Sequence, residues 1–447
     1  MRTKATLLCV LLIPLCYTPA RAQSEDLQVN DLYTLFDQIF GTILGPDFIK
    51  GPGPHGQHFI PAAEHANQQL TPALNSLITS NIASFPLSST VPGVTFDFSG
   101  GRPVRVVESM GPIFSETAAT LGQRKLTVGF NATYLGLDQF RGMRLDQMEF
   151  TFPHQDVDTS GGLGNVSSET DLIHVSPDLH ASATIFAFYA TYGVAPNFDV
   201  GIAVPFVSAN LSGNVLATID SYTLAGIGLA LHSFGGDPRN PVLSRTIAYD
   251  ESAKGIGDIA LRFKFRFAKL PNAGLATLVD VRIPTGDEKN FLGTGSTNVR
   301  ALLIGSRSLG SFTPHLNVGY HYRGAKLDSD QMEFALGFDQ KLGPKVTFAM
   351  DALGAIDVNA SEAVALGSDA PISITFEQPG EDGYKAVRTF RASNIPNWKH
   401  DNTIHLAAGA RWAPTDQFQL LGNVLVPMTQ GGLNSTVIPT LGFSIVF

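Results

Sequence analysis

The sequence predicts an all-β protein: a closed antiparallel transmembrane β-barrel of about twelve strands, with a small N-terminal helical and hairpin segment acting as a plug or cap. Three observations predict this class. Apolar and polar residues alternate along most of the chain, and long and short connections alternate between the predicted strands. Only 15% of residues are charged, whereas Gly and Phe contribute 44 and 30 residues. That composition is unusual for a soluble protein but suits a barrel that exposes half of its side chains to lipid.

Residues 1–22 are predicted to be a secretory signal peptide. Arg2 and Lys4 precede an apolar stretch over residues 5–17, and Ala20-Arg21-Ala22 places small residues at the two positions that a signal peptidase reads. The apolar stretch is too short to span a bilayer as a helix, which takes about 20 residues. Both cysteines lie in this segment, so we expect a mature chain without disulfides.

The charge of the chain argues against one class of partner. The formal net charge is −9, and removal of the signal peptide takes away three more cations. An acidic protein does not present the basic face that nucleic-acid phosphates require, so no nucleic-acid partner is expected.

Residues 23–122 lack the barrel pattern and are predicted to form a plug in the lumen or a small periplasmic cap. Asp31 can cap a helix that ends near Ile43, and a second amphipathic helix is expected near residues 64–82. Residues 85–114 resemble a hairpin that turns around Ser99-Gly-Gly-Arg102. If this hairpin joined the barrel wall, the strand count would rise to fourteen.

Residues 123–447 are predicted to form the barrel wall. Residues 259–267 show the pattern most clearly, because five apolar residues at odd positions alternate with an alanine and three cations at even positions. A helix would mix both sets around its surface, whereas a strand keeps them on opposite faces. The strands are expected near residues 123–137, 180–193, 198–210, 255–268, 275–284, 298–309, 313–323, 330–341, 345–358, 403–413, 418–428 and 436–447.

The connections between these strands alternate in length. Long ones are expected at residues 138–179, 211–254, 285–297 and 359–402, and tight turns such as Ala195-Pro-Asn197 fall between them. Outer-membrane barrels have short periplasmic turns, long external loops and an even strand count. Closure also removes the unpaired edge strands that lipid would not tolerate. A soluble β-sandwich is the alternative, since alternation also describes a sheet with one wet and one dry face.

The last predicted strand ends in an aromatic residue. Its alternating residues are Val437, Pro439, Leu441, Phe443, Ile445 and Phe447. This pattern resembles the C-terminal signature that the outer-membrane assembly machinery reads. We therefore expect a bacterial outer-membrane location, with membrane lipids around the barrel and the barrel assembly machinery as a partner through Phe447.

Charged residues gather on the strand face opposite the apolar one. A cation facing lipid at the bilayer midplane costs about 2–4 kcal/mol, so these side chains are expected to line a watery or paired interior. The predicted lumen-lining residues are Asp258, Arg262, Lys264, Arg266, Asp280, Arg282, His315, His321, Arg323, Glu333, Asp351, His405 and Arg411, together with Arg300 and Asp339. The alternative is that they only pair with one another and fill the lumen.

The sequence gives little sign of catalysis or of a cofactor. His55, His58, Glu64 and His65 could gather a transition metal, but His-x-x-His in a Gly/Pro-rich loop is a weak pattern, so no metal site and no cofactor are predicted. No Ser/His pairing stands in a recognisable motif, so no catalytic residues are predicted either.

One loop carries a resemblance to a known family. Ile283-Pro-Thr-Gly-Asp287, followed by Leu292-Gly-Thr-Gly295 and a strand, resembles the outer-membrane β-barrel family labelled with the meta-cleavage pathway of phenol degradation. Gly255-Ile-Gly-Asp258 is similar to that family's preceding segment, and the resemblance covers residues 255–325 best. It implies a channel for small, often aromatic or hydrophobic compounds, distantly similar to fatty-acid channels, and it brings no catalytic residues.

The sequence therefore favours a porin-like outer-membrane channel that passes a small-molecule solute by diffusion, with residues 23–122 partly blocking the lumen. Two alternatives remain: a barrel enzyme of the lipase or protease type, and a structural or adhesive surface barrel. An enzyme needs a nucleophile and a base within hydrogen-bond reach, and a structural barrel would conduct no solute.

Overall fold

The structure is a computed structural model. It describes residue 27 and residues 29–85, 96–97, 104–105, 110–324, 329–368, 370–377 and 385–447. The predicted signal peptide at residues 1–22 and the predicted turn at Ser99-Gly-Gly-Arg102 lie outside the described residues.

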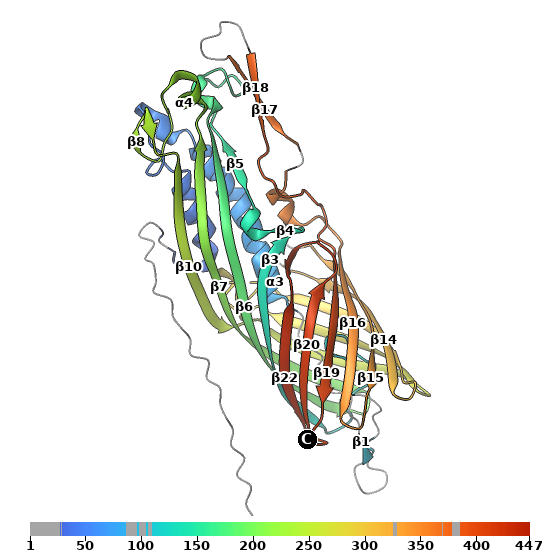
Figure 1. Cartoon of the computed structure of the whole chain (residues 1–447). Helices are drawn as coiled ribbons and strands as arrows, with labels where there is room; N and C mark the ends of the chain where they lie inside the picture. The colour runs from blue at the N-terminus through green and yellow to red at the C-terminus, as the bar shows by residue number, and fades with distance from the viewer. Residues whose placement is uncertain are drawn as a thin grey trace, which may run out of the picture.

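Twelve antiparallel strands form a closed barrel in the described part of the chain (Figure 1). Each wall strand pairs with the next one along the chain, and β22 (Ile438–Val446) pairs back with β3 (Leu126–Phe140) to close the ring. The other wall strands are β6 (Leu172–Ala195), β7 (Phe198–Asp220), β11 (Ile259–Leu270), β12 (Ala273–Ile283), β13 (Asn298–Arg307), β14 (Phe312–Tyr322), β15 (Gln331–Lys341), β16 (Val346–Asp357), β19 (Thr403–Trp412) and β20 (Phe418–Pro427). The predicted fold class and the count of twelve are confirmed.

The N-terminal hairpin does not add strands to this wall. β1 (Phe96–Asp97) pairs with β2 (Val104–Arg105) in a two-stranded sheet of its own. The alternative of fourteen wall strands is therefore wrong.

The two ends of the barrel differ. Connections at residues 196–197, 271–272, 308–311, 342–345 and 413–417 are short, and they lie with the C-terminus at one end, which we call the turn end (Figure 1). The longer connections lie at the opposite end, which we call the loop end. Short turns at one end and long loops at the other are typical of outer-membrane barrels.

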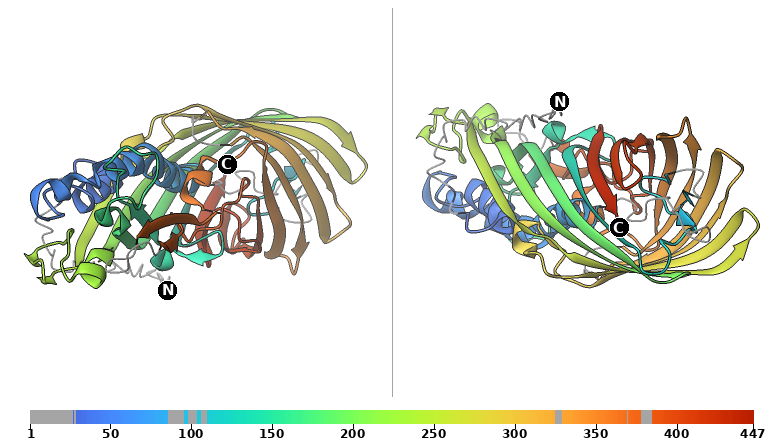
Figure 2. Two further views of the ribbon diagram at one scale, coloured as in Figure 1. Left: turned by 90° about the horizontal axis from the view of Figure 1, so that it is seen from above. Right: turned by 90° about the horizontal axis from the view of Figure 1, so that it is seen from below.

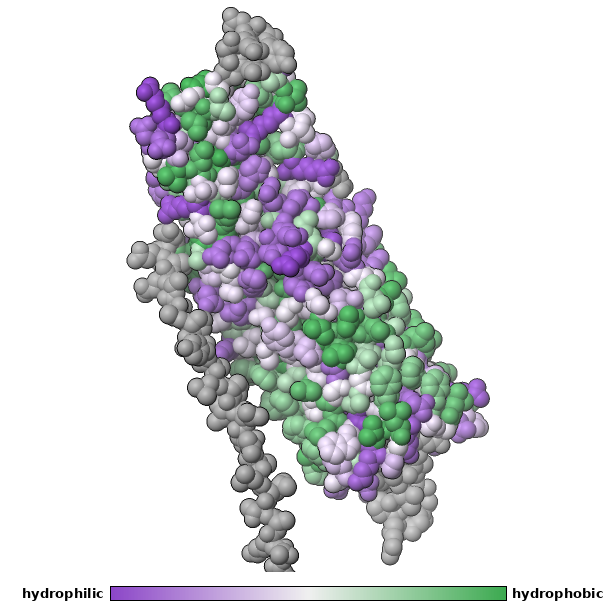
Figure 3. Space-filling model, viewed as in Figure 1, coloured by the Kyte–Doolittle hydropathy of each residue, from purple (hydrophilic) through white to green (hydrophobic). Residues whose placement is uncertain are grey.

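Side-chain parity separates an apolar outer surface from a charged inner one. In β11, Phe263 and Phe265 are exposed, whereas Arg262 and Lys264 between them are buried. Figure 3 shows hydrophobic residues gathered over the half of the molecule nearer the turn end and hydrophilic ones over the half nearer the loop end. An apolar band around the outside is what a barrel needs to span the hydrocarbon layer.

One side of the barrel wall extends far beyond the rest at the loop end (Figure 1). β6 and β7 pair from Ala195 opposite Phe198 up to Leu172 opposite Asp220. β10 (Ser244–Ile256) continues the line of β11 along β7. We call β10 and the loop-end parts of β6 and β7 the extended wall.

The extended wall was predicted to be loops, and that prediction is wrong for residues 172–179, 211–220 and 244–254. A strand crosses a membrane with about 9–11 residues, so these strands exceed what a membrane requires. The extra length has a different cause: its inner face buries a second layer.

That second layer is the N-terminal helices. η1 (Leu32–Thr34) and α1 (Leu35–Ile43) follow Asp31, whose carboxylate accepts a hydrogen bond from the backbone N of Thr34. The predicted N-cap is confirmed. The second helix begins earlier than predicted, since α2 (Ile60–His65), the π-helical η3 (Ala66–Leu70) and α3 (Thr71–Ala83) form one continuous run. No described helix is long and apolar enough to cross a membrane.

The helices pack on the inner face of the extended wall (Figures 1 and 2). Leu35, Phe36 and Ile78 of the helices lie in one buried hydrophobic cluster with Val175 and Leu211 of the strands. Apolar side chains on the inward positions of β6 and β7 are therefore covered by protein, although they lie beyond the apolar band.

Smaller elements complete the loop end. They are η2 (Gly53–Gln57), β4 (Met143–Arg144), η4 (Leu145–Gln147), β5 (Phe150–Pro153), η5 (Ser167–Thr170), α4 (Tyr222–Ile227), β8 (Gly236–Asp237), β9 (Asn240–Pro241), η6 (Glu288–Asn290), η7 (Glu362–Leu366), β17 (Ile372–Glu377), β18 (Lys385–Phe390) and β21 (Leu433–Ser435). A buried ion pair joins two connections at this end. Arg141 lies between β3 and β4, and its Nε is 2.8 Å from Oδ1 of Asp401, which lies just before β19.

A cation placed on the outer surface tests whether that surface meets lipid. Leu336 lies near the middle of β15 and its side chain is 60% exposed. We expect Leu336→Arg to lower the free energy of unfolding by about 2–4 kcal/mol in bilayers, the cost of a cation near the midplane. Leu342→Arg is the matched control, because Leu342 is 67% exposed at the turn end, where the cost should be near zero. Equal effects in urea titrations would contradict a lipid-facing β15.

Candidate solute site in the barrel lumen

A cavity of about 260 Å³ lies inside the barrel between α3 and the inner faces of several wall strands. Leu77 of α3, Phe85 and Phe114 contribute apolar side chains on the N-terminal side, and Leu353 and Leu425 contribute them from the wall. Engineered apolar cavities of about 150 Å³ hold benzene. The cavity is therefore large enough for a small organic molecule of about one ring.

Polar side chains line another part of the same cavity. Arg300, His321, Arg323, Glu333 and His405 all line it, and each was either predicted to line the lumen or named among its inward charges. Small-molecule sites combine a mostly apolar lining with a few placed polar groups, which orient the ligand. This cavity has that composition.

A row of alternating charges runs from strand to strand beside the cavity. Arg262 Nε donates to Asp280 Oδ2 at 2.9 Å, and Arg300 lies 3.6 Å from Asp280 and 3.5 Å from Glu333. His321 Nδ1 lies 2.9 Å from Glu333 Oε1. The register explains the row, because Arg262 stands opposite Asp280, and Asp280 opposite Arg300, on neighbouring strands. Opposite charges at such cross-strand positions stabilise a sheet.

Residues 110–124 cross the lumen on the turn-end side, and we call them the strap. Arg411 donates from Nε and Nη2 to the backbone oxygen of Pro112, and the backbone N of Leu121 donates to Asp199 Oδ2. The backbone N of Met110 donates to Thr347 Oγ1 at 3.1 Å. The strap is thus bonded to β7, β16 and β19 and obstructs the lumen.

Glu116 is the most strongly held residue of the strap. Its carboxylate accepts a hydrogen bond from Lys264 Nζ at 2.7 Å and lies 3.9 Å from Arg262 Nη1. Its backbone N donates to Asn317 Oδ1, and its backbone O accepts from Asn317 Nδ2. Because the side chain is only 6% exposed, this pairing is shielded from water and ions.

Ser115, His315 and Asp351 form a second buried contact of the strap with the wall. Ser115 Oγ lies 2.7 Å from both His315 Nε2 and Asp351 Oδ1, and His315 Nε2 lies 2.6 Å from Asp351 Oδ1. A hydrolase needs the carboxylate on the imidazole nitrogen that does not face the serine. Asp339 Oδ1 lies 3.5 Å from that nitrogen, Nδ1 of His315. His315 Nε2, however, donates to Asp351, whose carboxylate also accepts from Ser115 Oγ, so Nε2 has no lone pair to take the serine proton.

Three other predicted lumen residues bond backbone groups of α3, of a turn and of a loop. Arg282 donates to the backbone oxygens of Ala83 and Phe85 and so holds the end of α3. Arg266 Nη2 donates to Pro196 O at the turn end. Asp258 accepts from the backbone N of Gly286 and of Thr294, so it fixes the glycine-rich loop at residues 285–297 rather than facing the cavity.

Ser115 and Glu116 are interior residues that the sequence does not predict, whereas Asn317 shares its strand face with the predicted lumen residues His315 and His321. Asn317 alternates with apolar neighbours in β14, so its inward position could be inferred from parity. Ser115 and Glu116 stand in a segment without periodicity, and nothing local indicates that they contact strands more than a hundred residues away.

Comparison with known proteins gives one family. Residues 155–369 match the family described as the putative MetA-pathway of phenol degradation. The matched range contains the loop segments at 255–258, 283–287 and 292–295, so the resemblance drawn from those segments is confirmed. No curated protein matches the chain.

Solved outer-membrane proteins are similar at low identity. An outer-membrane channel from Pseudomonas putida F1 has 11% identity and a TM-score of 0.40, over 74% of this chain and 99% of that one. A FadL homologue from Pseudomonas aeruginosa has 10% identity and a TM-score of 0.33, over 80% and 98%. The toluene transporter TbuX from Ralstonia pickettii has 11% identity and a TM-score of 0.25, over 76% and 94%.

Proposed function

We propose that this chain, whose residues 155–369 match a family described by phenol degradation, is an outer-membrane channel for small, largely apolar compounds, including aromatic ones. The observation that carries the proposal is the cavity of about 260 Å³ inside the closed barrel, apolar towards α3 and charged towards Arg300 and Glu333. Such a lining accepts an apolar body with one or two polar substituents.

The apolar band supports a location in the bacterial outer membrane. Only helices and closed barrels satisfy all backbone hydrogen bonds in hydrocarbon, and this chain forms a closed barrel with an apolar outside. We assign the turn end to the periplasm and the loop end to the exterior, as short turns and long loops indicate.

The route of the solute follows from the same geometry. A molecule that enters at the loop end reaches the cavity beside α3, and the strap lies between that cavity and the turn end. Passage therefore requires movement of the strap, and diffusion down a gradient needs no energy-coupling site. The strap fits the expectation of a partly blocked lumen.

Two other functions are less well supported. An enzyme of the lipase or protease type would need an activated nucleophile. Although Asp339 lies 3.5 Å from His315 Nδ1, His315 Nε2 donates to Asp351 and cannot take the proton of Ser115. A purely structural barrel does not require an internal cavity with convergent polar groups.

Uptake by whole cells tests the channel. Cells with and without this protein receive a trace amount of a radiolabelled monocyclic aromatic compound, and the initial rate is measured. We expect several-fold faster uptake with the protein and unchanged uptake of a labelled sugar. Equal aromatic uptake in both strains would contradict the channel, and a matching increase for the sugar would point to an unselective pore.

Assembly into the membrane is tested at Phe447, the residue that directly follows β22. The backbone N and O of Phe447 exchange hydrogen bonds with Leu126, and its ring is exposed on the outside. We propose that this outward aromatic is read by the barrel assembly machinery. Deletion of Phe447 should deplete the heat-modifiable protein from outer-membrane fractions, whereas Phe447→Tyr should assemble normally because the outward aromatic ring persists. Normal assembly of the deletion would contradict the role of Phe447.

A further inference from the structure

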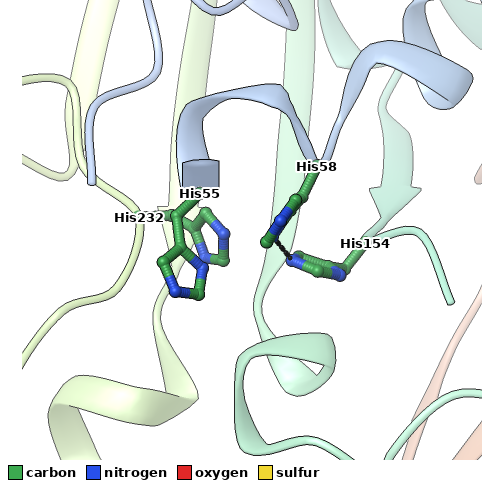
Figure 4. Close-up of side chains that lie close together, drawn as sticks. All are labelled: His55, His58, His154 and His232. Carbon is green, nitrogen blue, oxygen red and sulfur yellow. Dashed lines mark hydrogen bonds between the residues drawn. The ribbon is translucent and has the colours of Figure 1, made fainter. Parts of the chain in front are cut away.

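Four histidines from distant parts of the chain come together at the loop end. His55 lies in η2 and His58 directly after it, His154 follows β5, and His232 lies between α4 and β8. Their ring nitrogens, one from each residue, all lie within 4.8 Å of one another (Figure 4). Glu64 and His65, which the sequence grouped with His55 and His58, are exposed and are not members of this cluster.

The cluster is buried, and two of its nitrogens have no hydrogen-bond partner among the described residues. His58 and His154 are buried, and His232 is completely inaccessible. His55 Nδ1 and His232 Nε2 are buried without a partner. Buried polar atoms are nearly always hydrogen-bonded, so two orphan lone pairs in one cluster point to a ligand that accepts electron pairs.

Hydrogen bonds on the outer sides of two rings fix which nitrogen faces inward. His232 Nδ1 lies 2.8 Å from Asp171 Oδ2, and His154 Nδ1 lies 2.6 Å from the backbone oxygen of Gln155. A carboxylate or carbonyl oxygen can only accept here, so both Nδ1 atoms donate and each ring turns its Nε2 towards the cluster. A histidine held in this way by a carboxylate or carbonyl is the usual arrangement of a metal ligand.

The surroundings keep the ligands rigid. Asp171 is itself held by the backbone N and hydroxyl of Thr223, each at 3.1 Å. Phe59 is fully buried with its ring 5.4 Å from that of His154 and 5.3 Å from that of His232.

We propose that His55, His58, His154 and His232 bind one divalent transition-metal ion of the zinc, copper or nickel class. Imidazole nitrogens suit these ions, whereas Ca²⁺ and Mg²⁺ need oxygen ligands that the cluster lacks. With metal–nitrogen bonds of about 2.0–2.1 Å, tetrahedral ligand nitrogens lie roughly 3.4 Å apart. The present separations bracket that value, since His58 Nδ1 and His154 Nε2 are 2.8 Å apart and the widest pair is 4.8 Å.

Binding requires one proton to move. His154 Nε2 has no proton, so His58 Nδ1 donates in the hydrogen bond between them. A metal bound at both atoms replaces that hydrogen bond, and the proton leaves His58 Nδ1 for Nε2 of the same ring or for solvent. Metal binding commonly releases protons for this reason.

The ion would fasten the N-terminal segment to the external loops. Two ligands come from the segment that carries α1, α2 and α3, and two come from connections flanking the extended wall. The site is separate from the cavity, so it stands independently of the proposed transport. Its expected role is structural, because the ion would link the N-terminal helices to the connections beside the extended wall.

Metal titration of the full mature chain, purified in detergent without a histidine tag, tests the site. After treatment with EDTA and its removal, Zn²⁺, Cu²⁺, Ni²⁺, Mg²⁺ and Ca²⁺ are added separately, and bound metal is measured by mass spectrometry after desalting. We expect one equivalent of at least one of the first three ions, none of the last two, and a melting temperature that rises with free metal. No stoichiometric retention by the wild-type protein would overturn the proposal.

Variants locate the ion. His154→Gln and His232→Gln should abolish stoichiometric binding, and Asp171→Asn should weaken it by about 10–100-fold through loss of the outer hydrogen bond. His180→Gln is the matched control, because His180 is exposed on β6 and lies outside the cluster, and it should bind like the wild type. Unchanged binding by correctly folded cluster variants would place the ion elsewhere and overturn the assignment.

Discussion

Glu116→Ala should convert a channel of low conductance into one that opens often and widely. The substitution removes the carboxylate that pairs with Lys264 Nζ at 2.7 Å and lies near Arg262, while both cations stay buried under the strap. Removing one partner of a buried pair costs about 3–5 kcal/mol. If that cost falls on the state in which the strap crosses the lumen, the population of displaced straps rises by about two to three and a half orders of magnitude.

Single-channel recording in planar bilayers measures this effect. Gln123→Ala is the matched control within the strap, because Gln123 is exposed, and its conductance should equal that of the wild type. The double variant Glu116→Gln with Lys264→Met should open less often than Glu116→Ala, since neither charge remains unpaired. Conductance of a heat-modifiable, folded Glu116→Ala protein at the wild-type level would show that the strap does not gate the lumen.

Ala355→Trp should abolish uptake of the aromatic compound while leaving the barrel folded. Ala355 faces the cavity from β16, and an indole in place of its methyl group would occupy much of the space of about 260 Å³. The cavity offers room for the ring, so we expect little overpacking and a small change in stability. The initial uptake rate should fall to that of cells without the protein.

The neighbouring position supplies the control. Ile356 is exposed on the outer surface of the same strand, near the end that faces the loops. Trp is favoured at membrane interfaces, so Ile356→Trp should leave uptake and assembly unchanged. If both tryptophans reduced uptake equally, or if Ala355→Trp had no effect, the cavity would not lie on the solute's path.

The sequence determined the barrel because its signals are local. In β11, alternation alone placed Phe263 outside and Arg262 and Lys264 inside, since successive side chains of a strand point to opposite faces. The alternation of long and short connections predicted that the barrel has a turn end and a loop end, and the strand segments between them gave the count of twelve. Local signals also set the N-cap at Asp31, where one side chain bonds the backbone three residues away.

The sequence was wrong about the extended wall for an equally physical reason. The inward positions of residues 172–179 and 211–220 carry apolar side chains, but a membrane span needs no more than about 11 residues. The extra length is stable because α1 and α3 cover it. Each segment shows its own periodicity, but neither pattern indicates which helix packs on which strand.

The sequence placed Arg300, Glu333 and His405 inside the barrel, but only the tertiary structure decided which residues meet at the candidate sites. Glu116 meets Lys264 across 148 positions of the chain, and His58 meets His154 across 96. In the sequence His55 and His58 were half of a weak motif, because their partners His154 and His232 stand in loops without any pattern. The hydrophobic periodicity and the composition of a segment indicate only that segment's own secondary structure and which of its faces is buried. A buried ion pair or a four-histidine cluster depends on which segments the closed barrel brings together, and that is fixed only when the strands have paired.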